Sequence, residues 1–313
     1  MNLKDSFLLA AKGAAMGAAN VIPGVSGGTV AFITGIYERL INAIKSFDVR
    51  AVGLLLKFQF KAFAAHVDLG FLIPLGAGVV VSILSLAKLL EYLLGNHEVL
   101  VFAFFFGLIL SSIYFVGKLV KCWCPRSVMA FVVGAGIAIA ISFVPPAEES
   151  TNVLYLFLCG IAAISSMIIP GISGSFVLLI MGNYLLVLSS ISGAAKDPVS
   201  SLKVLVPFGA GCAVGIVALS HFLSWLFKRF HDAAVALMTG FVAGSLLIIW
   251  PWKEPAETVT KPSGEVKILS YDRFIPDFGN TQTLLAIALV VIGAGLVWGL
   301  EKSAAGKPQK GSS

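Results

Sequence analysis

The chain has 313 residues, of which 58% are hydrophobic and 12% are charged, and its mean hydropathy is +0.95. A soluble domain carries about 25% charged residues, so this composition excludes an ordinary water-soluble fold and is typical of integral membrane proteins. The net charge is +6, but the basic residues lie between apolar segments rather than in a patch interleaved with aromatic residues. They therefore indicate membrane topology, and we expect no nucleic-acid partner.

The apolar segments divide into two repeats, which predicts an all-α polytopic membrane protein. A transmembrane helix needs roughly 20 apolar residues to cross about 30 Å of hydrocarbon. The first repeat covers residues 1–146, with a broken helical hairpin at 6–47, an interfacial linker at 48–68 and spans at 71–94, 100–120 and 128–144. The second repeat covers residues 147–303, with a broken helical hairpin at 153–191, spans at 204–227, 233–250 and 284–300, and an outer loop at 251–281. Residues 304–313 are small and polar, and we expect them to form a disordered tail.

Each helical hairpin is either re-entrant or two complete crossings joined by a turn, and both forms return the chain to the side that it left. Counting crossings then places both termini and the basic linker on the cytoplasmic side, as the positive-inside rule requires. Lys196 and Lys203, beside Asp197, are the exceptions, because they fall on the outer side.

The linker carries Arg50, Lys57 and Lys61 at helical spacing. This pattern predicts a helix that lies on the cytoplasmic surface with its basic face against anionic lipid headgroups. A solvated helix that only carries topology charges is the alternative.

One stretch, residues 20–37, occurs again at residues 167–184. At one constant offset, Pro23 matches Pro170, Gly24 matches Gly171, Ser26 matches Ser173, Gly27 matches Gly174, Gly35 matches Gly182 and Tyr37 matches Tyr184. Proline ends a helix because it lacks the N–H and clashes with the preceding turn, while glycine reaches backbone angles that are closed to other residues. Each copy therefore predicts a helix stop, a polar turn and a new helix start within apolar sequence.

A second internal match supports duplication of the whole chain. Residues 71–78 align with residues 204–211, so that Pro74 pairs with Pro207. Each half then consists of one helical hairpin followed by three spans, which is an odd number of net crossings. Two such halves in tandem must be inverted relative to each other, the architecture of many secondary transporters.

The repeated turn has the chemistry of an anion site. A broken helix persists in hydrocarbon only where it is buried in protein or lines a polar cavity. The helix that starts at each break presents free N–H groups and the positive end of its dipole, and hydroxyls add further donors. The predicted phosphate-binding residues are Asn20, Gly24, Ser26, Gly27, Gly28 and Thr29 in the first copy, and Gly171, Ser173, Gly174 and Ser175 in the second. The alternative is that these small residues serve only helix packing or kinking.

Five ionisable residues near the membrane are candidates for charge recognition or coupling: Glu38, Arg39, Lys88, Glu91 and His221. An ionisable residue within a span usually faces a pathway or a partner. A Lys88–Glu91 ion pair and an interfacial place for Glu38 and Arg39 are the structural alternatives. His221 is either a proton carrier or, as we favour, a satisfied core histidine. The four cysteines and the remaining histidines lack metal-ligand spacing, so we expect no metal and no cofactor.

The motifs resemble those of a known family. Asn20-Val-Ile-Pro-Gly-Val-Ser-Gly-Gly-Thr, Gly35-Ile-Tyr-Glu, Pro170-Gly-Ile-Ser-Gly-Ser and Gly182-Asn-Tyr are similar to the paired signatures of the bacterial PopT family of polyprenyl-phosphate transporters. The resemblance covers nearly the whole chain. It implies a flippase of the bacterial cytoplasmic membrane that returns undecaprenyl phosphate to the inner face, with this lipid and the surrounding membrane lipids as partners. The second copy departs from the first, with Met167 in the place of Asn20 and Ser175 in the place of Gly28.

Two other function classes remain as alternatives. Undecaprenyl-diphosphate phosphatases look similar in outline, but their turn is followed by an arginine where Gly27 stands here, and this chain lacks a carboxylate cluster that could activate a nucleophile. We therefore expect no enzyme. A transporter of a small soluble anion is the other alternative, and a lateral opening wide enough for a lipid tail would argue against it. The coupling ion, the direction of transport, the chain-length preference and the oligomeric state stay open.

Overall fold

The computed structural model describes residues 3–21, 26–145, 147–193, 197–260 and 266–305. The first half of this part of the chain forms α1 (Leu3–Val21), α2 (Gly27–Ile33), α3 (Tyr37–Lys45), α4 (Val49–Leu56), α5 (Phe60–His66), α6 (Leu69–Gly117) and α7 (Pro125–Ile141). The second half forms α8 (Val153–Ile168), α9 (Gly174–Ile180), α10 (Tyr184–Gly193), α11 (Pro198–Arg229), α12 (His231–Ser245), β1 (Lys253–Thr260), β2 (Val266–Arg273) and α13 (Thr281–Ala305).

The helices have the length and composition of a multi-pass membrane protein, as the sequence predicts. Within the described residues, three segments are long and apolar enough to cross a membrane: Asn96–Gly117, Pro198–Arg229 and Thr281–Gly299. The number rises to five if two bent pairs each count as one span, Phe60–His66 with Leu69–Ser85 and Gly174–Ile180 with Tyr184–Ile191. The second pair bends by 116°, which is the geometry of a broken or re-entrant span.

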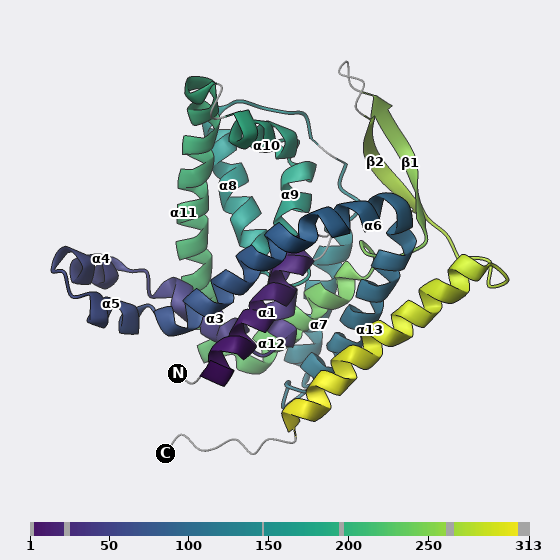
Figure 1. The fold of residues 1–313 in the computed structure, drawn as a ribbon, viewed down its shortest axis with the longest axis horizontal. Coiled ribbons are helices and arrows are strands. Elements are labelled where there is room, and N and C mark those ends of the chain that lie inside the picture. Colours follow the sequence, from purple (N-terminus) through teal and green to yellow (C-terminus); the bar gives the residue numbers. More distant parts are fainter. Residues whose placement is uncertain (1–2, 22–25, 146, 194–196, 261–265, 306–313) are drawn as a thin grey trace.

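The predicted spans 71–94 and 100–120 form one continuous run of helix, α6. Non-helical backbone angles at His97 kink this run at the predicted turn. Figure 1 shows α6 rising across the body and then descending beside α13. The predicted spans 128–144 and 233–250 appear as the shorter helices α7 and α12.

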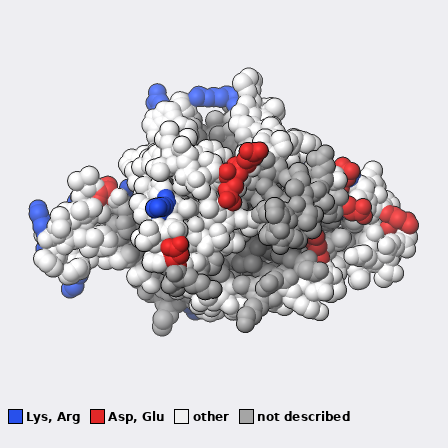
Figure 2. Space-filling model, turned by 90° about the horizontal axis from the view of Figure 1, so that it is seen from above, with Lys and Arg blue, Asp and Glu red and all other residues white. Residues whose placement is uncertain are grey.

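The expected single helix in the linker 48–68 is wrong. Two short helices, α4 and α5, replace it, because Phe58 has φ +54° and so interrupts the helical backbone between them. They protrude from the body, and basic side chains lie at their tip (Figures 1 and 2). Val49 and Phe58 are 89% and 78% exposed there, so the protrusion offers apolar as well as basic groups at its surface.

The expectation of an all-α fold is wrong in the outer loop, where β1 and β2 pair antiparallel from Lys253–Arg273 to Thr260–Val266. Both strands contain the β-branched residues that favour a pleated backbone, and the segment between them contains Pro-Ser-Gly, a turn-forming sequence. The base of the β-hairpin is fixed to the end of α12. Lys253 Nζ donates to the carbonyl oxygen of Ile248 (2.8 Å), and Arg273 Nε donates to that of Leu247 (2.9 Å).

The same helix contacts recur in both halves. α1 packs along α6, and α8 packs along α11. A Cβ added to Gly13 would collide with the carbonyl oxygen of Leu75, and one added to Gly160 would collide with that of Phe208. Gly13 and Gly160 stand at equivalent places in the two copies, so the sequence duplication extends to the helix packing, where small residues let backbones approach closely.

The third span of each half packs against the other half. α7 packs along α12, and α13 packs along α6. These contacts also depend on matched glycines, since a Cβ on Gly107 would collide with the carbonyl oxygen of Val290 and one on Gly240 with that of Phe131. Because each half packs its third span against the other half, the two halves share one core, which contains the broken segments.

Candidate functional site

The first break joins α1 to α2, and its polar side chains cap the new helix. Ser26 is the N-cap of α2, and its Oγ accepts a hydrogen bond from the N–H of Gly28 (3.1 Å). Asn20, one residue before the end of α1, accepts a hydrogen bond from the N–H of Gly27 through Oδ1 (2.8 Å). Both acceptors satisfy N–H groups that a helix start leaves unpaired. Gly24, which the sequence also places at this site, lies outside the described residues.

The second break joins α8 to α9. Pro170 follows the last residues of α8 and cannot continue it. Gly171 has φ +86°, a conformation that glycine adopts without strain, and a Cβ there would collide with the carbonyl oxygen of Phe241 in α12. Ser173 holds the N-cap position of α9 but makes no capping bond, and its hydroxyl pairs instead with that of Ser175 (2.8 Å).

The two breaks meet and bond to each other. Ser26 Oγ donates a hydrogen bond to the carbonyl oxygen of Met167 (3.1 Å), and the N–H of Gly171 donates one to Thr29 Oγ1 (2.7 Å). Ser26 and Thr29 are 2% and 1% exposed. Three of the residues that the sequence singles out, Ser26, Thr29 and Gly171, therefore join the two breaks in one polar contact, which we call the motif junction (Ser26, Gly28 and Thr29 with Met167, Ile168 and Gly171).

Gly28 lets the two breaks approach each other closely in the motif junction. A Cβ added to Gly28 would lie 2.8 Å from the carbonyl oxygen of Ile168 and 2.9 Å from that of Met167, closer than side chains pack. The sequence predicts that this glycine admits a ligand, whereas in this conformation it admits the end of α8. Its counterpart Ser175 is exposed, so the two copies contribute unequally to the contact.

The candidates Glu38 and Arg39 take part in ion pairs on the surface. Arg39 binds both carboxylate oxygens of Asp68, at 2.7 Å and 3.1 Å, and its guanidinium lies 4.5 Å from the ring centroid of Phe71. Glu38 Oε1 lies 3.2 Å from His231 Nε2. Both residues thus have side-chain partners at the exposed start of α3.

The remaining charged candidates lie on α6 and α11. Lys88 and Glu91 are within the helical run of α6, but their side chains lie outside the described part. His221 is exposed on α11, with Nδ1 2.9 Å from the carbonyl oxygen of Val217 in its own helix. The expectation that His221 is a core histidine is therefore wrong. It makes no hydrogen bond with the described residues of either motif.

Two residues that the sequence reasoning missed join separate elements. Lys12 in α1 is half-buried, and its Nζ donates to the carbonyl oxygen of Thr34, the C-cap of α2 (2.7 Å). An ammonium group at a helix C-terminus stabilises the negative end of the dipole. A cation within the apolar part of a helix, as Lys12 is in α1, is the sequence signal for such a partner. His231, which opens α12, was not visible as a partner of Glu38 because the two residues lie far apart in the chain.

The ends of α3 and α11 form a second contact between the halves. Lys45 Nζ donates to Ser224 Oγ (3.3 Å), which in turn donates to Asn42 Oδ1 (3.0 Å). The ring of Tyr37 lies between those of Phe32 and Phe227, with centroids 5.5 Å and 5.8 Å away. Together with the Glu38–His231 pair, these contacts make up what we call the α3 seal.

Within the described residues, no three His, Cys, Asp or Glu side chains lie close enough to hold a metal ion.

Comparison with known proteins identifies the family of this chain. A family model described as VCA0040-like, undecaprenyl phosphate translocase-like, matches residues 16–267, which include both breaks. The chain belongs to this family. A polyprenyl-phosphate transporter of Vibrio cholerae serotype O1 is 38% identical over 310 residues, covering 97% of this chain and 98% of the relative. A polyprenyl-phosphate transporter of Staphylococcus aureus is 32% identical over 252 residues, covering 77% and 84%. No solved structure matches. The family resemblance stated from the motifs is thereby confirmed.

Proposed function

We propose that this protein is a flippase that moves undecaprenyl phosphate or a related polyprenyl phosphate across the bacterial cytoplasmic membrane and so recycles the lipid carrier. The motif junction carries the proposal, because it places the start of α2, with the hydroxyls of Ser26 and Thr29, against the end of α8 and the turn before α9 inside an apolar body, where a phosphate needs donors. The names of the two relatives support the class of cargo.

We infer that the two halves are inverted repeats whose termini lie in the cytoplasm. The matched glycine contacts support two equivalent units. The start of α11 and the strands β1 and β2, all expected outside, lie at one end of the molecule, and the start of α1 and the end of α13 lie at the other (Figure 1). This separation agrees with the predicted sides of the membrane.

Transport then requires the halves to move relative to each other around the motif junction. The α3 seal joins α3 of the first half to α11 of the second, whereas α10, the counterpart of α3, packs against α9 and α11 of its own half. This difference between equivalent helices supports a state that is closed at the cytoplasmic end. The opposite state follows when the α3 seal opens and α10 moves toward α6.

The phosphate-binding residues remain those of the two turns, namely Asn20, Gly24, Ser26, Gly27, Gly28, Thr29, Gly171, Ser173, Gly174 and Ser175. In the present conformation, the hydroxyls of Ser26 and Thr29 are hydrogen-bonded to backbone groups of Met167 and Gly171. A phosphate that binds there replaces these contacts, so binding and separation of the halves are linked. Differential affinity for the two states is what permits a ligand to shift such an equilibrium.

The proposal is tested with purified protein in liposomes that carry a polyprenyl phosphate in one leaflet. Wild-type protein is expected to equilibrate the lipid between leaflets, and the double variant Ser26→Ala with Ser173→Ala to lose most of this activity while remaining folded. A second assay measures inorganic phosphate released from a polyprenyl diphosphate. If the wild type releases inorganic phosphate and moves no lipid, the transporter proposal fails and the protein is a phosphatase.

A further inference from the structure

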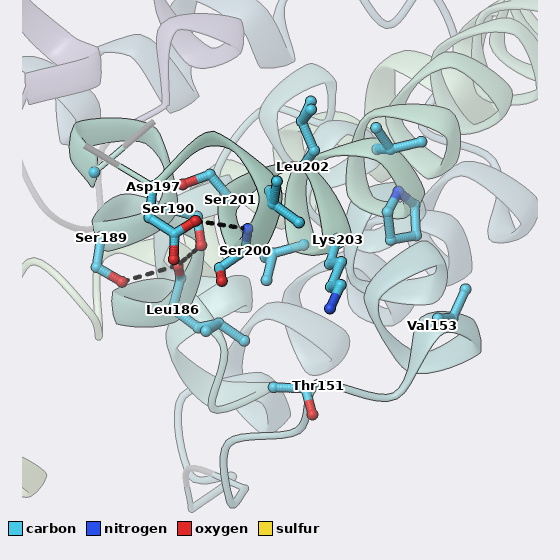
Figure 3. A pocket seen from close by; sticks show the side chains of 15 residues that line it. Thr151, Val153, Leu186, Ser189, Ser190, Asp197, Ser200, Ser201, Leu202 and Lys203 are labelled. Carbon is cyan, nitrogen blue, oxygen red and sulfur yellow. Dashed lines mark hydrogen bonds between the residues drawn. The ribbon is translucent and has the colours of Figure 1, made fainter. Parts of the chain in front are cut away.

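A large cavity lies where α10 and the start of α11 meet the segment that leads into α8 (Figure 3). Its volume is about 1030 Å³, and it lies apart from the motif junction, with which it shares no residue. Its walls come from the segment before α8, from α10 and from the first turns of α11. The cavity has one polar end and one apolar end, and the two ends differ in what they can bind.

Lys203 is the basic residue among those that line the polar end of the cavity. Figure 3 shows its amine pointing into the space between Leu186, Thr151 and Val153. The acidic side chain among the lining residues, Asp197, caps α11, where its Oδ1 accepts a hydrogen bond from the N–H of Ser200 (3.2 Å), and it also interacts electrostatically with Lys203. The cavity therefore has a cation directed inward, with its countercharge held at the helix start.

Lys203 is also one of the cations that the positive-inside rule does not explain. The crossing count places it on the outer side of the membrane, where basic residues are depleted near spans. A topology signal cannot account for this residue, and binding of an anion accounts for it directly.

A second, apolar cavity of about 720 Å³ continues the first along the outside of the helix pair α8 and α11. The two share Val153, Val206 and Pro207. Leu154 and Val206 are 67% and 60% exposed, so the continuation opens sideways, toward the lipid in a membrane protein. Farther along, α8 and α11 are in backbone contact at Gly160 and Phe208, which closes the groove.

We propose that this continuous groove is the site where a polyprenyl phosphate is held at the outer leaflet before it reaches the motif junction. The phosphate lies at Lys203, and the isoprenoid chain lies between α8 and α11. The inference rests on the proposed function. A charged end joined to an open apolar groove fits a single-chain lipid with an anionic head, whereas a free anion makes no favourable contact with the apolar part.

Two variants test the two ends of the groove in the liposome assay. Lys203→Glu reverses the charge at the polar end, and Ala210→Trp fills the apolar end. Each is expected to lower the transport rate about tenfold at low lipid concentration, as loss of one good contact does. Ala218→Trp is the matched control, because Ala218 is equally exposed on α11 but lines neither cavity. If both groove variants transport like the control, the groove is not the loading site, while the proposed function stands.

Photocrosslinking identifies the occupant. A benzophenone side chain at Val206 is irradiated in folded protein in vesicles that contain phospholipids and a small fraction of polyprenyl phosphate. Mass spectrometry is expected to find the polyprenyl phosphate in the adduct, enriched over its share of the lipid and lost in the Lys203→Glu background. An adduct with phospholipid alone would overturn the proposal. If the wild type moves no polyprenyl phosphate at all, the proposed function fails first.

Discussion

The Oγ atom of Ser26 donates a hydrogen bond to the carbonyl oxygen of Met167, 3.1 Å away, and so connects the break in the first half to the end of α8 in the second. The same Oγ accepts the N–H of Gly28, so one hydroxyl both starts α2 and ties it to the opposite half. Any movement that separates the halves must break this bond. Ser26 is therefore the residue where helix capping and contact between the halves coincide with the proposed phosphate site.

Ser26→Ala should destabilise the protein more than Ser173→Ala. The first change removes an N-cap, worth about 1 kcal/mol, and leaves a buried carbonyl oxygen without its partner, which costs about 1–3 kcal/mol more. The second removes only the hydroxyl pair with Ser175. Thermal unfolding in detergent, followed by tryptophan fluorescence, should give a clearly lower Tm for Ser26→Ala. Equal Tm values would show that the motif junction contributes no stability.

Gly171→Ala should prevent stable folding, whereas Gly35→Ala should be tolerated. Both glycines have positive φ, at +86° and +70°, so both substitutions carry the same backbone strain of roughly 1–2 kcal/mol. Only at Gly171 does the added Cβ also collide with a backbone carbonyl, that of Phe241, while nothing lies within 4 Å at Gly35. Yield of monodisperse protein and Tm measure the difference. Similar behaviour of the two variants would contradict the close contact between the second break and α12.

Lys253 should make stability rise with pH above about pH 8. Burial lowers the pKa of Lys253 to about 8, although Glu98 opposes the shift. An unfolded lysine titrates near 10.5, so between these values the unfolded chain holds a proton that the folded chain has released, and raising the pH favours folding.

The measurement compares the wild type with Lys253→Met at about pH 7 and about pH 9.5. The stability of the wild type relative to the variant should increase by about 2 kcal/mol over this interval, seen as a growing difference in Tm. The variant also loses the bond to Ile248 and the contact with the ring of Phe102, but those losses add an offset that the comparison between pH values removes. A constant difference in Tm would argue against a buried amine.

Lys12→Met should reduce transport by about tenfold with a small loss of stability, on the order of 1 kcal/mol. The reason is that Lys12 holds the C-terminal end of α2 through Thr34 and thereby orients the helix start at Ser26. Lys4→Met, at an exposed position of the same helix, is the control and should have no effect. Because an arginine can reach the same carbonyl oxygen, Lys12→Arg should restore transport. Failure of this rescue, with the control normal, would exclude a positioning role.

Local sequence chemistry was sufficient for several features of the fold. The apolar segments, the two Pro-Gly breaks and the duplication follow from composition and residue order, because helix stops and helix starts depend on neighbouring residues. The β-hairpin follows from the same reasoning, since two segments with β-branched residues flank the turn-forming sequence Pro-Ser-Gly, but the apolar pattern predicts helices alone. In the linker, the periodicity of the basic residues was real, yet the backbone at Phe58 divides the helix.

The sequence by itself therefore determined that this is a membrane protein with two equivalent broken segments, and which residues those segments contain. Only the tertiary structure decided which groups meet: Ser26 with Met167, Glu38 with His231, and Lys203 with the groove between α8 and α11. The physical reason is that a cap or a turn is specified by residues a few positions apart. A contact between halves depends instead on how whole helices pack, and matched glycines at distant positions set how closely they approach.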